Sequence, residues 1–202
     1  MAFINSDDKY LPWAFHVVSS IFSDCPEVEW LTTGRMLEWN AEGVPATIKH
    51  SDGFARRLFY SGYYLSSHPA WCGMHIQQES TFWRRSLWEK AGAAVVSDYF
   101  LDFELWCRFW KCAPLYTVPV ALGGFRIHSG SLSCQNPAGW NRGCHAVLAS
   151  YREPGWGFWN LRLRRKACAL LGRLRSVLAA PAKQVYYDHG ARRWQTRTVR
   201  VI

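Results

Sequence analysis

A short acidic cluster near the start of the chain is the first feature that could do chemistry. Asn5-Ser6-Asp7-Asp8 follows Ala2-Phe3-Ile4, which has the composition of the last residues of a buried strand. Pro12 then begins a segment with the apolar spacing of a helix. Carboxylates between a strand and a helix lie where open α/β sheets bind ligands, and they can share a divalent cation with substrate phosphates. A second interpretation is that the Asp residues only cap the helix.

Three further polar motifs follow, each next to a predicted strand or helix. They are Gln78-Glu79-Ser80-Thr81-Phe82-Trp83-Arg84-Arg85, Asp102-Phe103-Glu104-Leu105-Trp106-Cys107-Arg108 and Gly124-Phe125-Arg126-Ile127-His128. The pattern predicts strands at 29–34, 35–40, 115–118 and 121–127, helices at 54–60 and 102–111, and a terminal hairpin around 184–194. Residues 35–40 are expected to pair with 29–34. Ser86-Leu87-Trp88-Glu89 matches a capping box at the start of another short helix.

The composition indicates one compact soluble domain with an appendage. The chain has 202 residues, of which 49% are hydrophobic, and this is enough to bury a sizeable core. Seven scattered cysteines without a Cys-x-x-Cys pair argue against a zinc ribbon or a disulfide framework and favour reduced thiols in a cytosolic protein. The sequence contains no stretch of 18 uncharged apolar residues, so it does not predict a transmembrane helix.

In their order and spacing, the four motifs resemble the second half of a family 2 glycosyltransferase with the GT-A fold. The similarity is greatest to bacterial non-processive members that build cell-surface polysaccharides. It covers about residues 1–135 and implies the C-terminal part of a GT-A domain, which is an α/β fold with a Rossmann-like mixed sheet. In this family, a nucleotide-binding half precedes the strand that ends in the metal-binding Asp-x-Asp motif, to which Asn5-Ser6-Asp7 corresponds here. That half has no counterpart in this sequence. We therefore expect a fragment, with residues 136–202 as a basic amphipathic extension.

The resemblance also implies roles for individual residues. Asp7, with His128, would hold Mg²⁺ or Mn²⁺ against the diphosphate of a nucleotide sugar. Asp102 would be the general base that takes the proton from an acceptor hydroxyl, although N-capping would also explain it. We expect this carboxylate to be ionised at neutral pH because it lies at a helix N-terminus. Six further residues would contact donor or acceptor: Asn5, Asp8, Gln78, Glu79, Arg84 and Arg126.

The function implied is that of an inverting glycosyltransferase that moves a sugar from a metal-bound nucleotide-diphosphate donor to a saccharide or lipid-linked acceptor. Because the nucleotide-binding half is not represented, catalysis by this chain alone is in doubt. The alternative is a non-catalytic remnant or interaction module that binds saccharide or a membrane surface. Asn5 stands where the family has the first Asp of its motif, so it is expected to contact the ribose rather than the metal.

The positive charge of the protein is concentrated at its C-terminal end. Residues 151–202 contain twelve Lys and Arg residues but only Glu153 and Asp188 as acids. Residues 156–179, in which Trp and Leu alternate with Arg, predict peripheral contact with an anionic membrane. An ordinary helix packed on the domain is an equal alternative, whereas no nucleic-acid fold signature supports binding of nucleic acid. The expected location is cytoplasmic, with peripheral contact at the inner face of the plasma membrane.

Overall fold

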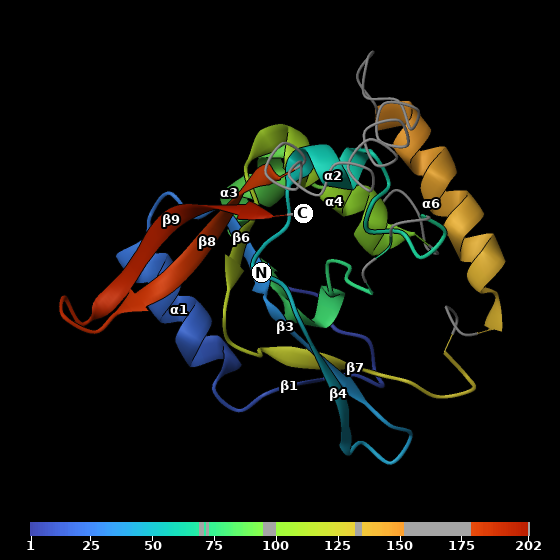
Figure 1. Cartoon of the computed structure of the whole chain (residues 1–202), viewed down its shortest axis with the longest axis horizontal. Coiled ribbons are helices and arrows are strands. Elements are labelled where there is room, and N and C mark those ends of the chain that lie inside the picture. Colours follow the sequence, from blue (N-terminus) through green and yellow to red (C-terminus); the bar gives the residue numbers. More distant parts are fainter. Residues whose placement is uncertain (69–70, 72, 95–99, 132–134, 152–178, 202) are drawn as a thin grey trace, which may run out of the picture.

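The computed structural model describes residues 1–68, 71, 73–94, 100–131, 135–151 and 179–201. Two mixed sheets with helices packed around them form the fold, so the predicted α/β class is confirmed (Figure 1). One sheet has the strand order β5-β2-β6-β8-β9 and the other has the order β1-β7-β3-β4. The strands are β1 (Lys9–Tyr10), β2 (Trp30–Thr33), β3 (Arg35–Trp39), β4 (Pro45–His50), β5 (Thr81–Trp83), β6 (Tyr116–Val118), β7 (Gly123–Arg126), β8 (Ala180–Asp188) and β9 (Arg193–Val201). The helices are α1 (Ala14–Asp24), α2 (Arg56–Tyr60), η1 (Gln78–Ser80), α3 (Arg85–Lys90), α4 (Leu101–Cys112) and α6 (Pro137–Tyr151).

Strand β2 is a fully buried inner strand of the five-stranded sheet. It pairs antiparallel with β5 and parallel with β6. Its side chains alternate between two apolar clusters: Trp30 packs with the helices α3 and α4, and Leu31 packs with α1. Because both faces are covered, all four residues of the strand are buried, as expected for a strand inside an α/β layer.

Helix α1 covers one face of this sheet. Its buried residues Ala14, Val18 and Ile21 are four and three positions apart, which places them on one side of a helix. The helix begins at Ala14, two residues after the proline that predicted it. Trp13 precedes the helix and is 48% exposed, so it does not belong to the buried face.

Helix α4 covers the other face and agrees with the helix predicted at 102–111. Trp106 stacks on Trp30 with a centroid distance of 5.6 Å. Arg108 binds Glu104 at 3.0 Å and also donates to the carbonyl oxygens of Ala91 and Ala94, at 2.7 and 2.6 Å. These bonds fix the helix against the segment that follows α3.

The second sheet corrects the predicted pairing of residues 35–40. Strand β3 does not pair with β2; it pairs antiparallel with β4, which was not predicted, and parallel with β7. The chain passes from one sheet to the other at Gly34, whose N–H donates to Val118 at 2.7 Å and whose carbonyl accepts from Ser51 at 3.0 Å. A side chain at Gly34 would overlap the carbonyl oxygen of Ser51. The local pattern predicted a strand correctly, but its partner is set by this change of direction.

Two further expectations, for residues 2–4 and for the start of α3, are also wrong. Ala2-Phe3-Ile4 is not a strand, because only Met1 forms a backbone bond with the edge of β5, accepting from Trp83 at 3.0 Å. Phe3 instead packs on Trp83 and Trp88, at 5.2 and 5.9 Å between centroids. The capping box is not formed either, since the helix α3 begins at Arg85 and no side chain caps it.

The C-terminal hairpin is confirmed and is longer than predicted. Strands β8 and β9 pair from Ala180↔Val201 to Asp188↔Arg193, and β8 joins the main sheet parallel to β6 (Figure 1). Strands from both sides of the expected domain boundary at residue 135 therefore belong to the same sheet. Of the predicted membrane segment 156–179, all but residue 179 lies outside the described residues. No helix in the described part of the chain is both long and apolar enough to cross a membrane.

Candidate functional site

A group of acidic side chains lies where the two sheets meet, beyond the carboxyl end of β2. The acids come from the turn before β1, from η1 and from the first turn of α4, and His128 joins them from the residues after β7. Strand β1 pairs with β7, with Lys9 opposite Gly124, which brings residues 5–8 to the end of β7. A Cβ on Gly123 would overlap the carbonyl of Glu79, so η1 lies directly against the same strand. The topology thus gathers three of the sequence motifs.

Asp7 and His128 form a direct pair in this group. The His128 Nε2 and Asp7 Oδ2 atoms are 2.7 Å apart, and both side chains are partly exposed. The hydrogen bond with His128 holds the pKa of Asp7 below its usual range, against the opposing effect of burial. The two residues that the sequence predicted as metal ligands are therefore in contact.

Asp8 holds the turn to the end of β7. Its Oδ1 accepts the backbone N–H of Arg126 at 2.8 Å, and its Oδ2 accepts a bond from Asn5 Nδ2 at 3.1 Å. Asn5 Oδ1 in turn accepts from Gln78 Nε2 at 3.5 Å. Burial raises the pKa of Asp8 in spite of the Arg126 N–H bond. Four predicted contact residues thus form one chain of hydrogen bonds.

Glu79 is the most deeply buried carboxylate of the group, with 3% of its surface exposed. Its Oε1 has no hydrogen-bond partner among the described residues. Burial raises the pKa of Glu79 well above its ordinary value, and the charges of Asp8 and Asp102 add to this effect. The neutral carboxyl is therefore favoured, because a second or third negative charge here would be poorly solvated.

Asp102 lies in the first turn of α4, as predicted, but its ionisation differs from the expectation. The backbone N–H groups of Asp102 and Phe103 lower its pKa, whereas desolvation raises it by more, so the net shift is upward. The helix N-terminus is thus not the dominant effect. A raised pKa makes this carboxylate a stronger base than the sequence suggested.

The structure does not bring Arg84 to the cluster. Its guanidinium donates to the carbonyl oxygens of Val28 and Phe22, at 2.8 and 2.5 Å, at the end of α1. It therefore lies at the opposite end of β5 from Glu79. Arg126 is in the cluster through its backbone, while its Nε is buried and has no hydrogen-bond partner in the described part of the chain.

Comparison with known proteins leaves the family open. No family model matches the chain, and no curated protein matches it.

The donor set of the cluster fits a cation that is shared with a ligand. No group of three or more His, Cys, Asp or Glu side chains within the described ranges could hold a metal alone. Mg²⁺ is commonly held by one or two carboxylates together with substrate phosphates and water. Asp7 can supply such a carboxylate, and His128 can supply a second ligand once its bond with Asp7 is exchanged. Phosphate oxygens would have to complete the shell.

Several residues that position the cluster were not singled out from the sequence. Gln77 Nε2 donates to the carbonyl of Leu37 at 2.8 Å, and Ser80 Oγ donates to that of Gly123 at 3.1 Å. These bonds anchor η1 between β3 and β7, and they are the reason Glu79 is held inside. In the sequence, the consecutive glycines at 123 and 124 could have indicated that another segment packs here, because adjacent glycines in a strand permit close backbone approach.

Proposed function

We propose that this chain carries the metal-binding and acceptor half of an inverting glycosyltransferase with a GT-A fold. The observation that supports the proposal is the contact between distant motifs, above all the Asp7–His128 pair at 2.7 Å across 121 residues. An N-capping role for the acidic turn would need no such partner, and no side chain caps the helix α1. The donor would be a nucleotide sugar and the acceptor a saccharide or a lipid-linked saccharide.

In this proposal the residues have separate tasks. Asp7 and His128 would hold Mg²⁺ or Mn²⁺, and the chemistry that such an ion would supply is neutralisation of the charge on the leaving diphosphate. Asp8 holds the turn in place through the Arg126 N–H, and Asn5 and Gln78 offer amide groups to sugar hydroxyls. These contacts place the donor before any bond changes.

The transfer itself requires one base. The acceptor oxygen forms a bond to the anomeric carbon while the bond from that carbon to the diphosphate oxygen breaks. The electron pair leaves with the diphosphate, and the hydroxyl proton moves to the Asp102 carboxylate. The raised pKa of Asp102 suits this role, because a base is most effective when its pKa approaches the working pH.

Glu79 fits a supporting role beside this reaction. A neutral carboxyl can donate a hydrogen bond, whereas a carboxylate can only accept. The upward shift of its pKa therefore favours a proton donor at the inner wall of the site. The orphaned Oε1 atom leaves capacity for a bond to an acceptor or donor hydroxyl.

Metal-dependent nucleotide binding tests the proposal. We expect titration calorimetry with UDP, GDP, CDP and ADP to detect binding of at least one nucleotide in the presence of Mn²⁺. Binding should be lost in Asp7→Ala, because a carboxylate ligand is removed. The control is Asp52→Ala, which breaks the other surface Asp–His pair, His50–Asp52 at 3.2 Å, and should leave binding unchanged.

Mn²⁺ also gives a local readout. As a paramagnetic ion it should broaden the NMR signals of His128 and residues 5–8 before those of His50. If no nucleoside diphosphate binds the folded protein with or without Mn²⁺, the donor site is absent and a non-catalytic binding module is the better description.

A further inference from the structure

Two cationic side chains meet at the turn between β3 and β4, next to the carboxylate cluster. Strand β1 pairs with β7 so that Lys9 lies opposite Gly124, and β7 pairs with β3 so that Arg126 lies opposite Trp39. The three strands are neighbours in the four-stranded sheet (Figure 1). The sheet therefore brings together a lysine, an arginine and a tryptophan that are far apart in the sequence.

Both charged groups border the space beside Gly43. Lys9 Nζ donates to the carbonyl oxygen of Gly43 at 3.0 Å and lies 4.2 Å from the centroid of the Trp39 ring. A Cβ added to Gly43 would lie 3.6 Å from Lys9 Nζ and 3.2 Å from Arg126 Nη2. Two positive charges that approach the same point repel each other, so an anion bound between them would be stabilised by both.

The Arg126 guanidinium has donors that the protein itself does not use. Its backbone N–H donates to Asp8, and its Nε is enclosed without a hydrogen-bond partner among the described residues. The Nη groups are not enclosed in this way, and in the described part of the chain they donate to no residue. A guanidinium presents its N–H groups in a fixed fork that matches phosphate oxygens. Arg126 can therefore bind phosphate through its Nη groups.

Three nearby carboxylates limit the positive charge of this region. The His128 bond lowers the pKa of Asp7 and burial raises that of Asp8, and in both cases the charge of Arg126 acts in the lowering direction. Glu42 precedes Gly43 in the turn and is exposed. The acids offset most of the charge of the two cations, so a free anion would gain little here. A divalent cation on Asp7 and His128 would change this balance, and we therefore expect anion binding to depend on it.

We propose that Lys9 and Arg126 form a phosphate-binding subsite beside the Asp7–His128 pair. The Arg126 Nη groups donate to the phosphate oxygens, and Lys9 supplies a second positive charge from above the Trp39 ring. The inference deepens the proposed function and rests on it for the cation. The phosphate belongs either to the diphosphate of the nucleotide-sugar donor or to a lipid-linked acceptor.

Two small phosphates without a base or a sugar test the subsite. Pyrophosphate represents the donor diphosphate, and glycerol phosphate represents a phosphate on the acceptor. Each would be titrated calorimetrically into the full chain with and without Mg²⁺. We expect at least one of them to bind about tenfold or more tightly with Mg²⁺, since the two ligands are coupled through their charges. The probe that binds more tightly identifies the source, and ¹H–¹⁵N NMR should show shifts at Lys9 and Gly43.

Matched variants locate the binding. Lys9→Gln and Arg126→Gln should each weaken binding of the preferred phosphate about tenfold, because each removes a charged donor. Lys9→Arg keeps the charge and should retain most of the affinity. Arg85→Gln and Lys90→Gln remove the same two kinds of charge from α3, where each pairs with a glutamate, and should have no effect. Lys9 is exposed, so its variant is expected to fold, and thermal unfolding would verify this for all variants.

The outcomes separate this inference from the proposed function. If Asp7→Ala abolishes phosphate binding while Lys9→Gln and Arg126→Gln leave it unchanged, the cation alone holds the phosphate and the subsite is refuted. If Asp7→Ala has no effect while Lys9→Gln weakens binding, the subsite stands and the proposed cation site is refuted. Losses in the α3 controls as large as that in Lys9→Gln would attribute the binding to the overall charge of the protein. Absence of binding of both probes with and without Mg²⁺ would overturn both proposals.

Discussion

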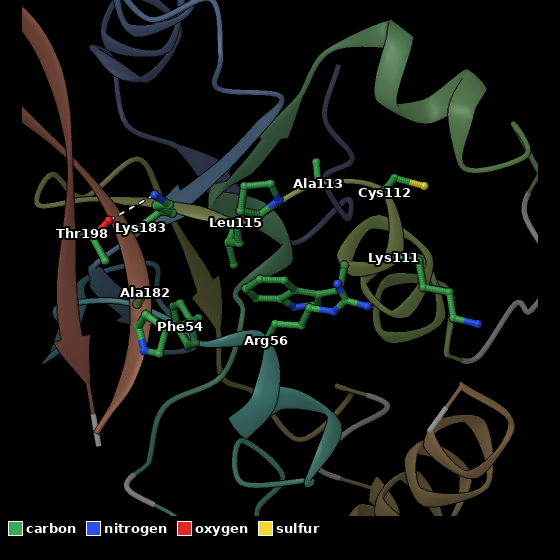
Figure 2. A pocket seen from close by; sticks show the side chains of 12 residues that line it. Phe54, Arg56, Lys111, Cys112, Ala113, Leu115, Ala182, Lys183 and Thr198 are labelled. Carbon is green, nitrogen blue, oxygen red and sulfur yellow. Dashed lines mark hydrogen bonds between the residues drawn. The ribbon is translucent and has the colours of Figure 1, made fainter. Parts of the chain in front are cut away.

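The two ends of helix α4 carry opposite chemistry on one scaffold. At its start, Asp102 belongs to a group of carboxylates collected from three separate segments. At its end, Lys111 borders a cavity of about 290 Å³ between this helix and the β8–β9 hairpin, and the charged residues in the described part of its lining are Arg56, Lys111 and Lys183 (Figure 2). The helix thus follows the usual preference for acids in the first turn and bases in the last. Among the described residues, each end therefore concentrates one sign of charge.

The two regions differ in how their charged side chains are held. Asp7 and Asp8 have His128 and the Arg126 N–H as partners, while burial and neighbouring charge oppose ionisation of Glu79. At the other end, Lys183 donates to Thr198 and Lys111 lies over the ring of Tyr151. The acidic region is therefore held by bonds among its own members, and the cations are each held by a neighbouring side chain.

The largest expected effect would separate catalysis from binding at the acidic end. Asp102→Asn keeps the shape of the side chain but removes the base, so release of nucleoside diphosphate from nucleotide sugars should fall by about 10²–10⁴-fold. Mn²⁺-dependent nucleotide binding should be unchanged. Unaltered release by the folded variant would remove Asp102 from the mechanism.

The next effect would break both regions together. Trp106→Ala removes the ring that stacks on Trp30 beneath α4 and should lower the free energy of unfolding by about 3–5 kcal/mol. Urea denaturation measures this loss. Trp13→Ala removes a 48% exposed ring with one hydrogen bond and should cost about 1 kcal/mol. Similar losses in the two variants would contradict the assignment of α4 as the shared support.

A smaller effect concerns the pH dependence at the acidic end. Because the folded protein raises the pKa of Glu79, this group favours folding below its unfolded pKa of about 4.3, and stability is lost as the pH rises towards the folded pKa. Glu79→Gln should be more stable than wild type at pH 8, because the unfolded carboxyl is ionised there while burial opposes its ionisation in the folded protein. The advantage should vanish at pH 4. Glu89→Gln, at an exposed position, should show no such difference on thermal unfolding.

The smallest effect sharpens the cationic end. Lys111→Gln removes a favourable charge from the last turn of α4 and should reduce stability by about 0.3–1 kcal/mol. Chemical denaturation measures this loss. An unchanged free energy of unfolding in the folded variant would show that the Lys111 charge does not stabilise the end of the helix.

Much of the local structure could be predicted from short-range patterns. The spacing of apolar residues predicted α1 and α4, and the alternation near residues 184–194 predicted the hairpin. The pairing of β3 could not be predicted, because a strand pattern specifies a face but not a partner. The prediction of a strand at Ala2-Phe3-Ile4 was wrong for a related reason. The composition of the segment suits a strand, but only Met1 meets the edge of β5.

The candidate site divides in the same way. The sequence alone determined which groups could act, since carboxylates, His128 and amide side chains at motif spacing are visible without a structure. Tertiary structure decided which of them meet: Asp7 reaches His128, whereas Arg84 binds carbonyls at the end of α1. It also reversed the expected shift of the Asp102 pKa, because desolvation depends on all surrounding atoms whereas the helix N-terminus is a local feature. The cavity lies wholly on the tertiary side, since the end of α4 and the β8–β9 hairpin form its walls only when β8 pairs with β6.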